Sequence, residues 1–132
     1  MFYGCTVLTG VTIPDGVNSI GYSTFCGCTG LTSIAIPERV TAIGDEAFKN
    51  CTGITDVVVS DSVTEIGYRA FEGCSSLTSI TLPFVGATKD GSKNTHFGYI
   101  FGAFHYGGNP TCVPSGLQTL IITGGTSIAD CA

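Results

Sequence analysis

A period of 23 residues runs through most of this chain and constrains its fold more than any other feature. Four cysteines, four phenylalanines, a leucine column and three Ile-Gly pairs repeat with it: Cys5, Cys28, Cys51 and Cys74; Phe2, Phe25, Phe48 and Phe71; Leu8, Leu31, Ile54 and Leu77; Ile20-Gly21, Ile43-Gly44 and Ile66-Gly67. One such unit cannot bury its apolar side chains alone, whereas stacked copies share a continuous core. The period therefore predicts a solenoid.

Each unit contains one short strand pattern. In the second unit Leu31, Ile34 and Ile36 are expected to point inward, while Ser33 and Ala35 face outward, which suits a strand in a parallel ladder. A proline then ends the strand in three of the units, at Pro14, Pro37 and Pro83, because proline removes a ladder donor.

The segment that returns the chain to the next strand has a different spacing. Its apolar residues are three or four positions apart, which predicts a helical or 3₁₀-like turn: Val40, Ile43, Ala47, Phe48 and Cys51. Gly44 is expected to permit a tight bend within it.

The unit from Leu31 to Cys51 is similar, almost residue for residue, to the repeat of the BspA-like leucine-rich repeat family, L-T-S-I-x-I-P-x-x-V-T-x-I-G-x-x-A-F-x-x-C. The resemblance covers Phe2 to about Pro83 and returns from Leu117 through Asp130. It implies a right-handed coil of about five turns in one domain, residues 1–132, with a parallel β-ladder on one face and short helical or 3₁₀ turns on the other.

The same resemblance carries an expectation about function. Members of the family are typically surface-exposed or secreted proteins of host-associated microbes. It therefore implies a non-enzymatic extracellular or cell-surface protein that acts in adhesion or scaffolding through protein-protein contact.

Residues 84–116 depart from the period and form an enlarged repeat with an insertion. The leucine column moves from Leu77 to Leu117, which is 40 residues instead of 23. The sequence from Phe97 to Gly102 echoes the one from Ile66 to Phe71, which predicts a degenerate repeat with loops at 86–95 and 106–115. The insertion is either a recognition loop or a surface loop packed by its own aromatic residues. Its candidate partner-binding residues are Phe97, Tyr99, Phe101, Phe104, His105 and Tyr106.

Composition excludes two classes of partner. The net charge is −5 with only five lysines and arginines, so we expect no nucleic-acid surface, which needs clustered basic residues. No run of 18 apolar residues occurs, so we expect no membrane insertion, and any export signal would lie outside this chain.

The seven cysteines divide into two groups. Those of the 23-residue column are expected to be small, buried free thiols. Cys26 and Cys131 align with charged residues of other units, so we expect both near the surface, and Cys112 lies in the insertion. The candidates for a disulfide are Cys26, Cys112 and Cys131.

Catalytic and metal-binding patterns are weak. The two histidines, His96 and His105, lack zinc-type spacing, although with Cys112 they offer three ligands in one region. A small metal or redox protein is thus a lower-ranked alternative, and two solvated histidines beside a packed cysteine are the favoured interpretation. We expect no enzyme and no cofactor.

The two ends match in repeat phase. Joining Ala132 to Phe2 would reproduce the unit from Ala42 to Cys51, which leaves two alternatives. The chain is either part of a longer solenoid or a subunit that stacks head to tail into a filament. The candidate interface for stacking comprises Phe2, Cys5, Leu8, Val11 and Ile13 at one end and Leu117, Leu120, Ile122 and Ile128 at the other.

Overall fold

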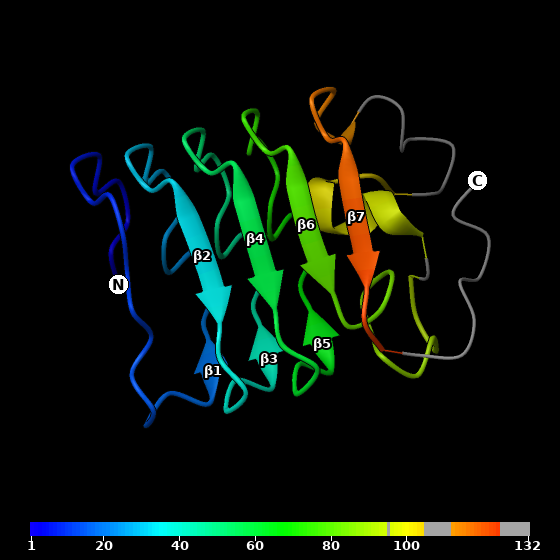
Figure 1. Ribbon diagram of the computed structural model, residues 1–132. Coiled ribbons are helices and arrows are strands. Elements are labelled where there is room, and N and C mark those ends of the chain that lie inside the picture. Colours follow the sequence, from blue (N-terminus) through cyan, green and yellow to red (C-terminus); the bar gives the residue numbers. More distant parts are fainter. Residues whose placement is uncertain (95, 105–111, 125–132) are drawn as a thin grey trace.

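The computed structural model describes residues 1–94, 96–104 and 112–124 and shows parallel strands that stack turn upon turn (Figure 1). The larger sheet has four strands in the order β2-β4-β6-β7, and the smaller has three in the order β1-β3-β5. The larger sheet consists of β2 (Ser33–Ile36), β4 (Asp56–Val59), β6 (Ser79–Leu82) and β7 (Thr119–Ile122). The smaller consists of β1 (Ser19–Ile20), β3 (Ala42–Ile43) and β5 (Glu65–Ile66). This arrangement confirms a repeat solenoid; its handedness and number of turns stay predictions.

The strand register confirms the sequence period. Ser33 pairs with Asp56 and Asp56 with Ser79, each 23 positions further along, whereas Ser79 pairs with Thr119, 40 positions further along. Ile34 and Ile36 are buried and Ser33 and Ala35 are exposed, as the alternation predicts. The enlarged repeat thus enters and leaves the ladder without shifting its register.

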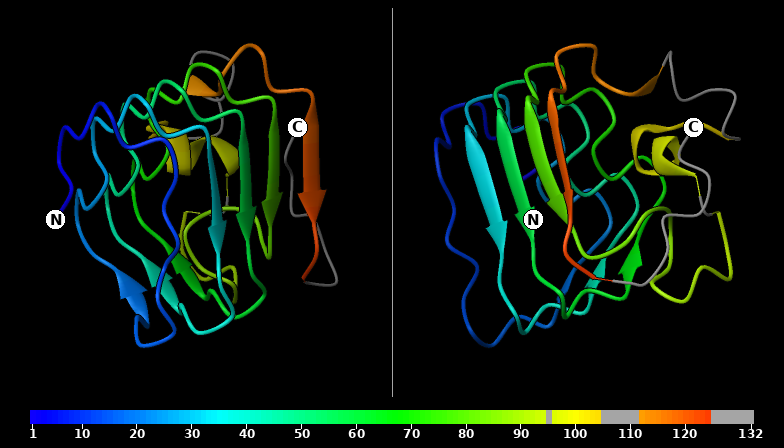
Figure 2. Two further views of the ribbon diagram at one scale, coloured as in Figure 1. Left: turned by 60° about the vertical axis from the view of Figure 1, so that its left-hand side comes forward. Right: turned by 45° about the vertical axis from the view of Figure 1, so that its right-hand side comes forward.

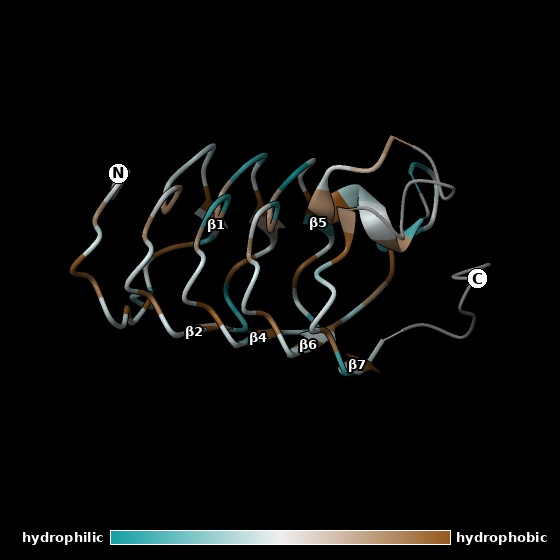
Figure 3. Ribbon diagram, turned by 90° about the horizontal axis from the view of Figure 1, so that it is seen from above, coloured by the Kyte–Doolittle hydropathy of each residue, from teal (hydrophilic) through white to brown (hydrophobic). Residues whose placement is uncertain are grey.

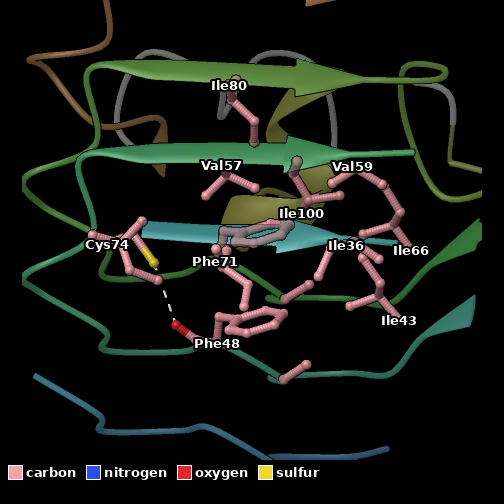
Figure 4. Packing of buried hydrophobic residues seen from close by; sticks show 14 of the residues in the cluster. Ile36, Ile43, Phe48, Val57, Val59, Ile66, Phe71, Cys74, Ile80 and Ile100 are labelled. Atoms are coloured by element: carbon pink, nitrogen blue, oxygen red, sulfur yellow. Dashed lines mark hydrogen bonds between the residues drawn. The ribbon is translucent and has the colours of Figure 1, made fainter. Parts of the chain in front are cut away.

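The core fills the space between the two sheets. Figure 3, seen from above, places β2, β4, β6 and β7 along one side and β1 and β5 along the other. The rings of the phenylalanine column stack on one another with centroids 5.5, 5.3 and 5.4 Å apart, from Phe2 to Phe71. Phe48 and Phe71 are fully buried beside the isoleucine and valine columns (Figure 4).

The return segment differs from the predicted helical turn. Ala42 and Ile43 form β3, and the chain then makes successive turns in which Ala47, Lys49 and Cys51 donate amide hydrogen bonds three residues back. Glu46 and Asn50 have φ of 57° and 58°, and such left-handed residues prevent a continuous helix. The three-residue spacing thus agrees with the hydrogen bonds of these turns. The sequence did not predict that the segment forms a strand of a second sheet in place of a helix.

Gly44 does not have a positive φ, so a left-handed backbone is not the reason for a glycine at this position. A Cβ atom at Gly44 would lie 2.8 Å from the carbonyl carbon of Gly21 and 2.8 Å from the amide nitrogen of Tyr22. The glycine is required because adjacent turns approach closely here.

The insertion forms the next turn of the stack. Its 3₁₀ helix η1 (Phe97–Phe101) accepts hydrogen bonds from the preceding turn, from the Phe71 amide to the Ile100 carbonyl (2.8 Å) and from the Arg69 amide to the Tyr99 carbonyl (3.4 Å). These contacts are consistent with the degenerate repeat that the echo of Ile66–Phe71 predicts, whose bounds stay a prediction. Figure 2 shows η1 at the end of the stack away from the N-terminal turn.

Candidate interaction surfaces

The thiol column is a structural element of the core. The thiols of Cys28, Cys51 and Cys74 donate hydrogen bonds to the carbonyl oxygens of Phe2, Phe25 and Phe48, at 3.0, 3.0 and 3.3 Å. The last of these bonds is drawn in Figure 4. Burial raises the pKa of Cys51 to about 12 and also raises the pKa of Cys74, so both stay protonated at neutral pH. A protonated, buried thiol is neither a metal ligand nor a nucleophile.

Cys26 is buried, not near the surface as its alignment with charged residues suggested. Its position is partly covered by neighbouring turns, since the side chains of Lys49 and Glu72 in the same column are only 22% and 32% exposed. Long charged side chains reach solvent from this position, but the short cysteine side chain does not. Cys112 is half-buried, and Cys131 lies outside the described residues, so the disulfide prediction stays untested.

The aromatic residues of the insertion divide between core and surface. Phe97 and Phe101 are buried and pack edge to face with centroids 5.3 Å apart, so they support the fold and cannot contact a partner directly. Phe104 is 78% exposed, and Tyr99 is half-buried. His105 and Tyr106 lie outside the described residues.

His96 is buried, contrary to the expected solvated histidine, and a ring nitrogen lies 2.9 Å from the Ala103 carbonyl oxygen. Nε2 is therefore engaged in a hydrogen bond that holds the loop after η1. Within the described ranges, no group of three or more His, Cys, Asp or Glu residues could hold a metal ion.

An aromatic patch, defined by half-buried Tyr68, Arg69 and Tyr99 and by exposed Phe104, joins the insertion to the regular turns. The Tyr68 ring lies 5.3 Å from that of Tyr99 and 5.2 Å from that of Phe104. The Arg69 guanidinium lies 5.0 Å from the Tyr68 ring centre, and the Tyr68 hydroxyl donates to the Gly102 carbonyl at 2.8 Å. These contacts fix the ring of Tyr68, on which Phe104 rests.

Three charged side chains, Lys49, Glu46 and Glu72, border the aromatic patch beside Arg69. Lys49 lies between Glu46 (3.0 Å) and Glu72 (3.2 Å), and Arg69 lies near the same two carboxylates at 3.8 and 3.7 Å. The hydrogen bond from Lys49 lowers the pKa of Glu46. The two carboxylates therefore lie beside the guanidinium group of Arg69 in the patch.

The outer face of the larger sheet offers little for recognition. Apart from Asp56, its exposed strand residues are small or aliphatic, such as Ser33, Ala35 and Val58. The neighbouring threonine column has a structural role, because the hydroxyls of Thr55 and Thr78 donate to the carbonyls of Thr32 (3.3 Å) and Thr55 (3.0 Å).

The residues predicted for head-to-tail stacking lie at opposite ends of the described stack (Figure 1). Phe2 is 47% exposed and borders an apolar cavity of about 370 Å³ that Val11, Ile13 and Val17 also line. Cys5, Leu8 and Val11 are half-buried. At the other end, Leu120 is 40% exposed and Leu117 and Ile122 are half-buried. Ile128 lies outside the described residues.

A polar cleft between the insertion and the smaller sheet was not foreseen. It has a volume of about 420 Å³ and is lined by Asp45, Glu65, Thr88, Lys93, Asn94 and Tyr99 above the backbone of Gly44 and Gly67. The insertion forms one wall: the Ile66 amide donates to the Ala87 carbonyl (2.8 Å), the Lys89 amide donates to the Thr64 carbonyl (2.9 Å), and Glu65 bridges Thr88 antiparallel. In the sequence, only the break in the 23-residue period at the insertion indicated a possible binding site in this region.

Comparison with known proteins agrees with this architecture. The family model for the BspA type leucine-rich repeat region matches residues 1–91 with six copies, and the chain belongs to this family. No match was found among curated proteins.

Two solved structures are similar to this chain. A leucine-rich repeat protein from Bacteroides ovatus is 41% identical over 62% of this chain and 21% of its own, with a TM-score of 0.60. The T. pallidum leucine rich repeat protein is 29% identical over 91% of this chain and 59% of its own, with a TM-score of 0.66. The chain thus spans less than two thirds of either protein.

The structure contains no helix long and apolar enough to cross a membrane, within the residues described.

Proposed function

We propose that this chain is a non-enzymatic interaction module, a single leucine-rich-repeat domain over residues 1–132, of an extracellular or cell-surface protein. It acts in adhesion or scaffolding by contacting other proteins. Membership of the BspA type leucine-rich repeat family supports a role in protein-protein interaction. The observation that carries the proposal is the aromatic patch, with exposed Phe104 resting on Tyr68.

The patch has the features of a protein-binding centre. Tyr and Arg are enriched among the residues that dominate interface energies, and Tyr68 and Arg69 are both held by neighbours. Phe104 exposes 78% of its surface and sits on Tyr68, so a partner would bury a large apolar area without having to order the ring beneath it. The outer sheet face has no comparable anchor among its described residues.

Binding of the fluorescently labelled chain to cultured epithelial cells tests this function. We expect saturable binding that protease treatment of the cells abolishes, and Phe104→Ser should weaken it at least tenfold because it removes a central apolar contact. Val7→Ser is the matched control, since Val7 is an exposed apolar residue in the N-terminal turn and its loss should leave binding unchanged. Binding that resists protease, or that both variants weaken equally, would contradict the proposal.

Head-to-tail stacking is the second candidate. It is favoured by the apolar cavity beside Phe2 at one end and by exposed Leu120 at the other, because an open heterologous contact generates filaments. The lower-ranked metal or redox function receives no support from the described residues, since His96 is buried against a carbonyl and the thiols of Cys51 and Cys74 are protonated.

A chain that stacks head to tail should form filaments as its concentration rises, and Leu120→Asp should abolish them. Val58→Asp is a matched control, because Val58 is 41% exposed against 40% for Leu120 but lies on the outer face of β4. Negative-stain microscopy over a concentration series measures this outcome. Monomers at every concentration, or loss of filaments in both variants, would exclude stacking through β7.

A further inference from the structure

The polar cleft beside the insertion has an excess of negative charge. Asp45 and Glu65 line it together with one cationic side chain, Lys93. The ion pairs among the described residues join only Glu46, Glu72, Lys49 and Arg69, so neither carboxylate of the cleft has an ion-pair partner there. One oxygen of Asp45 accepts the Tyr68 amide hydrogen bond (2.8 Å), which fixes that carboxylate.

Tyr99 supplies an aromatic side to the same cleft. It lines the cavity and belongs to η1, which is hydrogen-bonded to the preceding turn. Burial raises the pKa of Tyr99, and the negative charge of Asp45 raises it further. The Tyr99 side chain therefore lies close enough to Asp45 for the two groups to interact electrostatically.

The negative surface continues past Glu65. A shallower cavity of about 500 Å³ shares Glu65 and Thr88 with the cleft and is also lined by Asp90 and Lys89. Hydrogen bonds from Ser92 lower the pKa of Asp90 to about 2, so this carboxylate stays ionised at neutral pH. Of the two lysines nearby, Lys89 donates to the Asp61 carbonyl at 2.9 Å and is held outside the cleft.

We propose that this cleft binds a basic side chain, lysine or arginine, of a protein partner. The inference rests on the proposed function, because it names the chemistry of the partner that the interaction module recognises. An ammonium or guanidinium group between Asp45 and Glu65 gains charge-assisted hydrogen bonds, and the ring of Tyr99 adds a cation-π contact. The net charge of −5 favours encounter with basic partners.

A titration of the ¹⁵N-labelled chain with Nα-acetyl-L-argininamide, followed by NMR amide shifts, tests the site directly. We expect saturable shifts centred on Asp45, Glu65 and Tyr99. The neutral isostere Nα-acetyl-L-citrullinamide should bind at least tenfold more weakly, because it has nearly the same shape but lacks the charge that the carboxylates attract. Equal binding of the two probes, or shifts scattered over the surface, would overturn the proposal.

Charge-neutral variants locate the interaction. Glu65→Gln and Asp45→Asn should each weaken argininamide binding at least fivefold, and the asparagine keeps a side-chain oxygen for the Tyr68 amide. Glu38→Gln changes the net charge equally at an exposed position outside the cleft and should have no effect. If all three variants bind the probe alike, the cleft is not the site. If the chain binds cells but not argininamide, the proposed function stands and this inference fails.

Discussion

Replacing Phe48 with alanine is expected to lower the free energy of unfolding by about 3–5 kcal/mol. Phe48 is fully buried, and its ring stacks between those of Phe25 and Phe71 at 5.3 and 5.4 Å. The substitution leaves a cavity between two turns and removes two ring contacts. Because each turn of a solenoid contacts only its neighbours, a cavity in the middle weakens two interfaces at once. Urea unfolding followed by circular dichroism measures the loss.

Two other phenylalanines control for the chemistry of this substitution. Phe2 begins the same stack but has one ring neighbour and is 47% exposed, so Phe2→Ala should cost about 1–2 kcal/mol, less than an internal ring. Phe104 is 78% exposed, and Phe104→Ala should change stability by about 0.5 kcal/mol or less. Equal losses at Phe2 and Phe48 would show that the stack is not the source of the stability.

The sequence period predicted the ladder because each column has one environment in every turn. Burial repeats wherever the period does. The sequence therefore predicted the inward positions of Leu31, Ile34 and Ile36 and the 40-residue step to β7. The smaller sheet was missed because its strands are only two residues long, as in Ala42–Ile43, and such strands are too short to show alternation.

The candidate surfaces were less predictable, because they arise where the period ends. Nothing in the spacing of Phe97, Phe101 and Phe104 separates the two rings that enter the core from the one that stays exposed. The cleft was missed for a related reason: Asp45 and Glu65 lie in adjacent turns, and they line a cleft only because the insertion forms its other wall. The column of Cys26 indicated exposure because its charged members reach solvent by length alone.

Gly44→Ala is expected to destabilise the fold by about 2–3 kcal/mol, although it adds a single methyl group. The new Cβ would lie 2.8 Å from two backbone atoms of the preceding turn, at Gly21 and Tyr22, and 3.1 Å from the Ile20 carbonyl oxygen. Backbone cannot move aside as a side chain can, so the two turns must separate. That separation lengthens the hydrogen bond from the Gly44 amide to the Ile20 carbonyl, now 2.7 Å. Urea unfolding gives the loss, and hydrogen exchange at the Gly44 amide reports the separation.

Gly16→Ala distinguishes this steric cause from a general effect of replacing glycine. A Cβ at Gly16 meets nothing within 4 Å, and its φ is not positive, so the same substitution should be neutral or stabilise by about 0.4–1 kcal/mol through the unfolded chain. The Ile-Gly column of the period would then mark a contact between turns, because Gly67 meets the backbone of Gly44 and Asp45 in the same way. If Gly44→Ala proves as harmless as Gly16→Ala, the spacing of the turns is not set by this column.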